Sequence, residues 1–146
     1  MVDISLGNEF VAEVEESGFL AQDHDKQGQP FRWTTGHAKL VIPIDRAHPP
    51  QGLYVHLWPY RPANAEAGWL QLLVNQREMC GKEITRDQWQ RTFDLGGMAL
   101  GDEVVVEILS DTFVPSNLKN AGPDNRTLGL TVRDVKLLSR LDGPKN

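Results

Sequence analysis

The chain has 146 residues, of which 40% are apolar and 24% charged, and its net charge at pH 7 is −5. The length predicts a single domain over residues 1–146, and the acidic balance argues against nucleic acid, because phosphate binding requires a basic face. The single cysteine excludes an internal disulfide, and no apolar run reaches the roughly 18 residues of a membrane span. Because the N-terminus also lacks the pattern of a signal peptide, we expect a cytoplasmic protein.

Alternating hydrophobicity predicts about eight strands, separated by turns rich in Gly, Pro and Asn. In chain order they cover residues 9–16, 31–34, 38–44, 53–60, 69–77, 88–95, 103–110 and 127–138. A polar loop is predicted over 22–30 and a turn over 48–52. For residues 85–92, one helical turn is a minor alternative to the strand prediction. The tail from about 141 to 146 is expected to fray.

The last predicted strand changes phase. Its apolar residues occupy even positions up to Val132 and odd positions from Val135 onward. Because side chains alternate between the two faces of a strand, such a shift marks a β-bulge. We therefore predict a bulge at Arg133-Asp134, with both valines pointing into the core.

The connections between the predicted strands are mostly too short for crossover helices, so the strands are expected to pair antiparallel. Strands that each carry one apolar face bury those faces by packing two sheets together. The predicted fold class is all-β: a single antiparallel β-sandwich of jelly-roll or galactose-binding-like type.

One predicted strand carries an aliphatic face and an aromatic face. Its rings fall on the even positions, namely Tyr54, His56, Trp58 and Tyr60. The next strand places three more candidates on one face, namely Trp69, Gln71 and Asn75. If the two strands pair, these side chains form one patch whose flat rings and amide groups suit the apolar face and the hydroxyl edge of a sugar. The alternative is a central strand that is buried on both faces.

Signals for metal binding and catalysis are weak. Asp23 and Asp25 are the best candidates for a Ca²⁺ site, although a solvated loop explains them more simply. Cys80 follows a methionine in a predicted turn, and nothing near it in sequence marks it as a nucleophile. HExxH, CxxC and G-x-S-x-G motifs are absent from the sequence. We expect no metal, no cofactor and no catalysis.

Two short motifs carry a family resemblance. One is Ser110-Asp-Thr-Phe-Val-Pro115, followed by Asp124-Asn-Arg-Thr-Leu-Gly129; the other is Arg32-Trp-Thr34, followed by Gly36 and Ile42-Pro43. In the chain the Arg32 motif comes first and the Ser110 motif second. With the motifs in this order, residues 18–138 resemble the carbohydrate-binding-module-like β-sandwich accessory domains that are attached to bacterial glycosyltransferases. The resemblance implies a non-catalytic carbohydrate-binding or accessory module, with a glycan as ligand and a glycosyltransferase as a partner. The alternatives are a protein-interaction scaffold and a small sugar-modifying enzyme whose site carries no recognised motif.

Within these motifs we expect structural roles for Arg32, Trp33, Asp124, Arg126 and Gly129. Trp33 is interpreted as a core residue, with sugar stacking as the alternative. Arg126 is interpreted as a buried loop clamp held by Asp111 or Asp124, with ligand binding as the alternative. Gly129 is expected where another backbone or a large ring passes close.

Overall fold

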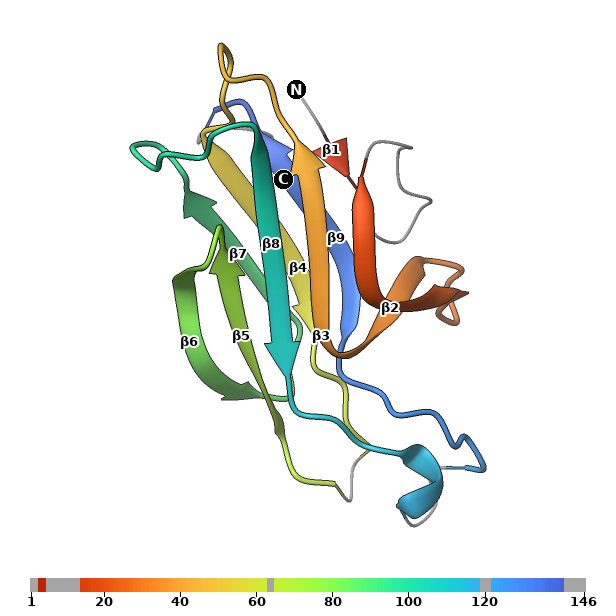
Figure 1. The fold of residues 1–146 in the computed structure, drawn as a ribbon. Coiled ribbons are helices and arrows are strands. Elements are labelled where there is room, and N and C mark those ends of the chain that lie inside the picture. The colour runs from red at the N-terminus through yellow and green to blue at the C-terminus, as the bar shows by residue number, and fades with distance from the viewer. Residues whose placement is uncertain (1–2, 5–13, 63–64, 119–121, 141–146) are drawn as a thin grey trace.

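The structure, a computed structural model, describes residues 3–4, 14–62, 65–118 and 122–140 (Figure 1). It consists mainly of strands, in chain order β1 (Asp3–Ile4), β2 (Glu15–His24), β3 (Pro30–Pro43), β4 (Gly52–Trp58), β5 (Gly68–Val74), β6 (Arg77–Thr85), β7 (Trp89–Asp94), β8 (Glu103–Ser110) and β9 (Thr131–Leu138). The helical structure within the described ranges is one 3-10 turn, η1 (Pro115–Asn117). No helix in this part of the chain has the length and apolar character needed to cross a membrane.

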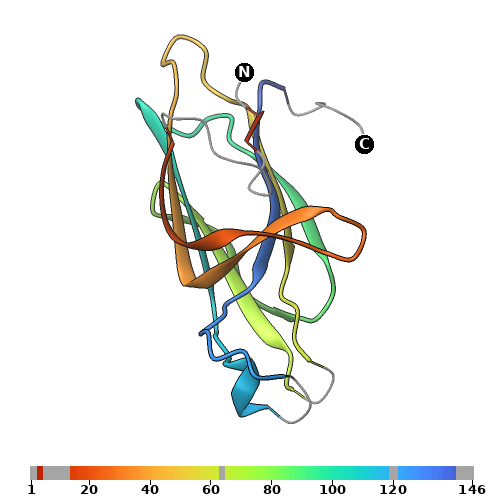
Figure 2. The same cartoon turned by 90° about the vertical axis from the view of Figure 1, so that its right-hand side faces the viewer.

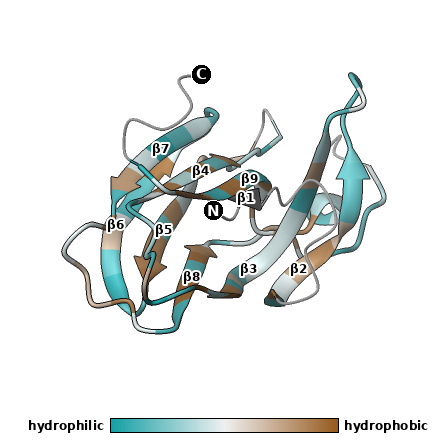
Figure 3. Cartoon of the chain, turned by 90° about the horizontal axis from the view of Figure 1, so that it is seen from above, coloured by the Kyte–Doolittle hydropathy of each residue, from teal (hydrophilic) through white to brown (hydrophobic). Residues whose placement is uncertain are grey.

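Two sheets face each other, and β3 takes part in both. Through residues 37–43 it pairs with β8, which continues to β5 and β6, whereas through Arg32 and Trp33 it pairs with β9, which continues to β4 and β7. Every one of these pairings is antiparallel. Figure 3 looks down the sandwich, with β7, β4 and β9 on one side and β5, β8 and β3 on the other. The structure therefore confirms the predicted all-β antiparallel sandwich.

Glycine allows β3 to change partners and β9 to pass close beside it. Gly36 lies between the two paired halves of β3 and has a φ of +104°, which side chains with a Cβ rarely adopt. A Cβ on Gly129 would lie 2.7 Å from the backbone nitrogen of Gly36 and 2.8 Å from Ser110 Oγ. The predicted close approach of another backbone at Gly129 is confirmed.

The core lies between the sheets and is formed by alternate residues of each strand. On β4 the inward positions are Leu53, Val55 and Leu57, all with an exposed fraction of 0%. The other strands contribute residues of the same kind, including Leu40, Ile42, Leu70, Leu72, Val104, Val106, Leu130 and Leu137. Burial of these aliphatic faces is the main stabilising contribution.

The predicted bulge in the last strand is confirmed. In the β4–β9 ladder His56 pairs with Asp134 and Leu57 pairs with Val132, so Arg133 has no partner on β4. Val132 and Val135 are both fully buried. As a consequence, Arg133 and Asp134 are consecutive residues that both lie on the outer side of the sheet.

Other strands differ from the prediction. The strands predicted over 31–34 and 38–44 form one long strand, β3, which ends at Pro43, and β2 extends into the predicted polar loop. Cys80 lies in β6, so the turn predicted there is wrong; the turn is Asn75-Gln76, where both residues have positive φ, as in a two-residue hairpin. Residues 85–92 contain no helix. Of the predicted strand 9–16 only the end is described, and the tail from 141 to 146 lies outside the described residues.

A buried arginine holds one end of the sandwich together. The side chain of Arg61 is only 2% exposed, and it donates hydrogen bonds to the carbonyl oxygens of Tyr60 (2.8 Å) and Gly129 (2.7 Å) and to Asp111 Oδ1 (2.8 Å). The same Asp111 oxygen accepts a bond from the backbone N–H of Trp69 at 3.1 Å. Burial lowers the pKa of Arg61, and the charge of Asp111 opposes that shift. Arg61 and Asp111 together thus connect the end of β8 with the starts of β5 and β9.

The motif residues Arg32 and Arg126 both form ion pairs, but in different surroundings. Arg32 is largely buried, binds both carboxylate oxygens of Glu16 at 2.7 and 2.8 Å, and so connects β2 to β3. Arg126 binds Asp124 at 2.7 Å, which is one of its two predicted partners. Its side chain is 49% exposed, so the expectation of a buried clamp there is wrong, and Arg61 takes that place.

Candidate functional site

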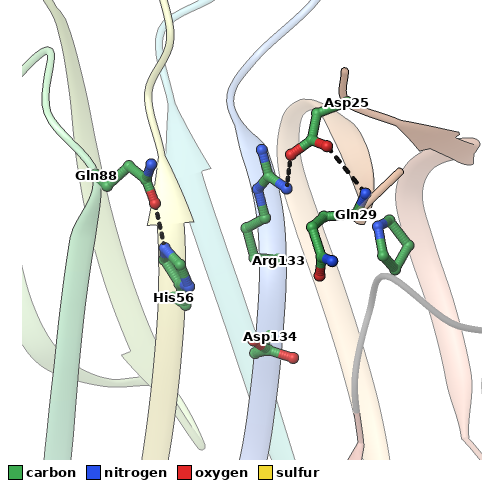
Figure 4. A pocket seen from close by; sticks show the side chains of 7 residues that line it. Asp25, Gln29, His56, Gln88, Arg133 and Asp134 are labelled. Carbon is green, nitrogen blue, oxygen red and sulfur yellow. Dashed lines mark hydrogen bonds and ion pairs between the residues drawn. The ribbon is translucent and has the colours of Figure 1, made fainter. Parts of the chain in front are cut away.

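Two adjoining open cavities lie over the outer face of β4 and β9, and we call them together the groove. The larger, of about 490 Å³, is the polar cavity, and its polar lining consists of Asp25, Gln29, His56, Gln88, Arg133 and Asp134. The smaller, of about 290 Å³, is the aromatic cavity, and its rings are Phe31, Trp33, Trp58 and Tyr60. Asp25 and Arg133 line both cavities. Figure 4 shows the polar cavity from close by.

The floor of the groove follows from the alternation of β4 and from the bulge in β9. Because Val55 and Leu57 point into the core, His56 and Trp58 point outward. The bulge places Arg133 and Asp134 on this same side, where a regular strand would present only one of two consecutive residues.

One wall of the groove is the hairpin between β2 and β3, which crosses in front of β9 in Figure 2. Asp25 closes its tip, because Asp25 Oδ1 accepts hydrogen bonds from the N–H groups of Gln27 and Gln29, both at 2.9 Å. Asp25 Oδ2 accepts a bond from Arg133 Nη1 at 2.7 Å, and this bond is the main reason that the pKa of Asp25 is lowered. The Asp25–Arg133 ion pair therefore fixes the hairpin against β9.

These bonds also bear on the weak Ca²⁺ candidates of the sequence. Both oxygens of Asp25 are already engaged by donors of the protein, and Asp23 accepts a bond from the N–H of His24. Within the described ranges, no group of three or more His, Cys, Asp or Glu side chains is arranged to hold a metal ion.

The opposite wall is the connection between β6 and β7. His56 Nε2 lies 2.7 Å from Gln88 Oε1, and Figure 4 shows the pair on the side of the cavity away from Asp25. Because an amide oxygen accepts, the hydrogen of this bond lies on Nε2. The indole N–H of Trp58 donates to the carbonyl oxygen of Arg86 at 3.0 Å. These bonds hold both rings in fixed orientations on the sheet.

The aromatic cavity combines exposed and buried rings. The ring centroids of Trp58 and Tyr60 lie 5.3 Å apart in an edge-to-face arrangement, and Tyr60 is 42% exposed. Trp33 is 9% exposed and contacts Phe113, with ring centroids 5.8 Å apart. The core position predicted for Trp33 is thus confirmed, although part of its ring also lines the cavity. Tyr54 lies further along β4, where its hydroxyl donates to Gln90 Oε1 at 2.9 Å and burial raises its pKa.

The other predicted candidates lie elsewhere, because β4 and β5 do not pair. β4 pairs with β7 and β9, and β5 pairs with β6 and β8, so the two strands belong to opposite sheets. Trp69 is covered by the ammonium of Lys82, 4.4 Å from its ring centroid, and Gln71 donates to Glu78. The single patch expected from the pairing of these strands is therefore wrong.

Asn75 has a structural place at the β5–β6 turn. Its amide donates to the carbonyl oxygens of Leu100 and Glu103, both at 3.2 Å, and accepts a bond from the N–H of Val105 at 2.6 Å. Its side chain is fully used in fixing the hairpin to the start of β8.

The structure adds residues that the sequence did not suggest for this site. Arg133, Asp134 and Gln88 line the groove, and the sequence signal for the first two was the phase slip in the last strand. No local signal marks Gln88, because it reaches the groove only through the pairing of β7 with β4.

Comparisons place the fold among known β-sandwiches. An acetyl xylan esterase from the rumen bacterium Butyrivibrio proteoclasticus has 11% identity and a TM-score of 0.52 over 98% of this chain, which spans 32% of the esterase chain. A family 35 carbohydrate binding module from Clostridium thermocellum has 7% identity and a TM-score of 0.51, with 95% of this chain and 98% of the module covered. CBM51 from Clostridium perfringens GH95, in complex with methyl-galactose, has 8% identity and a TM-score of 0.48, with 93% and 99% covered. No family model and no curated protein matches the sequence. The likeness to the esterase and to the family 35 module shows a shared β-sandwich fold.

Proposed function

We propose that this chain is a non-catalytic carbohydrate-binding module that binds a glycan in the groove. The observation that carries the proposal is the placement of the flat rings of Trp58 and Tyr60 directly beside a cavity lined by amide, imidazole and carboxylate groups. A sugar presents an apolar C–H face and polar hydroxyl edges, so it matches both parts of such a surface.

The arrangement of the polar groups supports a binding role over catalysis. They pair with one another on separate walls, His56 with Gln88 and Asp25 with Arg133, instead of converging on one point (Figure 4). Burial raises the pKa of the Cys80 thiol, which reduces its nucleophilic thiolate fraction.

The accessory role beside a bacterial glycosyltransferase is a further part of the proposal. Its support is the sequence resemblance, whose motif residues hold the fold: Asp111 binds the buried Arg61, and Gly129 allows the close approach of β9 to β3.

A protein-interaction scaffold remains the second candidate. The observation in its favour is the edge strand β6, where Ile84 is 74% exposed. Among the described residues the large hydrophobic side chains that are exposed are Ile84 and Tyr60. Two such residues do not make a broad apolar contact surface in this part of the chain.

Truncating Trp58 is expected to abolish glycan binding while leaving the fold intact. A shallow site has few fully desolvated contacts, so we expect the wild type to bind with a Kd of about 10⁻⁵–10⁻³ M, or roughly 4–7 kcal/mol. The measurement is a glycan array with wild type and Trp58→Ala, followed by titration of each bound glycan.

Trp69→Ala is the matched control, because its ring lies on the opposite sheet and outside both cavities. This variant should bind like the wild type. Binding that survives Trp58→Ala but is lost in a folded Trp69→Ala variant would place the site on the other sheet, and an array without any signal would favour the scaffold.

A further inference from the structure

We propose that the groove recognises an uncharged glycan of at least two sugar units, with Arg133 at the junction between two subsites. One sugar lies against Trp58 and Tyr60 in the aromatic cavity, and its neighbour is hydrogen-bonded in the polar cavity. This inference rests on the carbohydrate-binding function proposed above.

The size and the contrasting chemistry of the two cavities indicate two subsites. Sites for small molecules usually have volumes of roughly 300–1,000 Å³, and the cavities measure about 290 and 490 Å³. One is lined mainly by rings, the other mainly by side chains that donate or accept hydrogen bonds. A single sugar ring uses only one of these surfaces, whereas two linked rings use both.

Arg133 marks the junction because it lines both cavities. Its Nη1 binds Asp25, and its guanidinium carbon lies 5.2 Å from the ring centroid of Phe31. Its Nε is buried and has no hydrogen-bond partner among the described residues. A buried charged donor without an acceptor is costly, so an acceptor oxygen that a ligand brings to this guanidinium would be bound favourably. Hydroxyl and ring oxygens of a sugar are acceptors of this kind.

The charges around the groove predict an uncharged ligand. The carboxylates of Asp25 and Asp134 are balanced by the cations of Lys26 and Arg133. With no excess charge of either sign, the lining gives neither an anionic nor a cationic sugar a long-range advantage. Binding is therefore expected to depend little on salt.

The test is calorimetric titration of the full chain with oligosaccharide ladders. The probes are β-1,4-linked oligomers of glucose, xylose, mannose and N-acetylglucosamine from one to four units, with an oligogalacturonate ladder as the acidic comparison. We expect at least one neutral ladder to gain about tenfold in affinity from the first unit to the second or third, and little thereafter.

Two variants assign the gain to the subsites. Gln88→Ala and Arg133→Lys should bring the affinity for the disaccharide down to that for the monosaccharide, because Lys keeps a charge beside Asp25 but lacks the Nε donor. Arg126→Lys is the matched control, since Arg126 lies outside both cavity linings. It should retain the full length dependence.

The outcomes separate the inference from the function on which it rests. A monosaccharide that binds as tightly as its oligomers, or a preference for the acidic ladder, overturns the two-subsite inference and leaves the carbohydrate-binding function standing. A length dependence unchanged in both folded groove variants also overturns the inference. If neither the ladders nor the glycan array gives any signal, both the inference and the proposed function fail.

Discussion

Replacing Arg61 with alanine is expected to lower the free energy of unfolding by about 3–5 kcal/mol, the range for breaking a buried ion pair. The side chain is almost fully buried, and its loss removes donors from the carbonyl oxygen of Gly129 and from Asp111. Because Asp111 is 35% exposed, water can replace part of the lost contact, which favours the lower end of this range. The measurement is urea unfolding followed by tryptophan fluorescence.

Arg126→Ala is the control for this prediction. Its pair with Asp124 is local and half exposed, and exposed ion pairs contribute little to stability. We expect this variant to melt within a few degrees of the wild type. Equal losses in the two variants would contradict the assignment of Arg61 as the main clamp.

Trp33→Ala is expected to cost about 3–5 kcal/mol, which is typical of deleting a buried aromatic side chain. The ring is 9% exposed and lies edge-on to Phe113, which also supports the guanidinium of Arg61 at 4.5 Å from its ring centroid. Because both residues contact Phe113, the double variant should lose less than the sum of the two single losses. Unfolding curves of Trp33→Ala and of the double variant with Arg61→Ala measure this; a loss below about 1 kcal/mol for Trp33→Ala would show that its ring is not part of the core.

The strands that could be predicted from sequence are those with one aliphatic and one polar face. β4 and β8 alternate regularly because one face of each packs in the core, and a period of two in the sequence reports this directly. β6 escaped prediction because it is a charged edge strand whose pairing with β5 contains register shifts. Without a regular buried face, a strand leaves no periodic signal.

The bulge in β9 could be predicted from the local sequence pattern, but the contact that it makes could not. The change of phase between Val132 and Val135 is sufficient to locate it, since both valines must be buried. That the extra residue, Arg133, then meets Asp25 depends on a hairpin more than 100 positions away in sequence, and no local pattern encodes that contact.

The pairing of strands and the buried clamp could not be predicted for a related reason. Consecutive strands usually lie side by side, but the connection between β4 and β5 crosses from one sheet to the other. This crossing separates Trp69 from Trp58. Arg61 lies in that same connection, and from sequence its charge suggests a surface residue. Its burial follows from the ends of β5, β8 and β9 that surround it, and this arrangement is not encoded locally.

The most direct test of glycan binding in the groove uses the indole N–H signals of the four tryptophans in a ¹⁵N-correlated NMR titration. The probe is the oligosaccharide that binds most tightly in the ladders. The rings of Trp58 and Trp33 both line the aromatic cavity. The indole signal of Trp58 should shift strongly, whereas that of Trp33 should shift weakly because its ring is largely buried. The signals of Trp69 and of the buried Trp89 should stay in place, since neither ring lines either cavity. A shift at Trp69 with Trp58 unmoved, or no shift at any of the four, would contradict a glycan site in the groove.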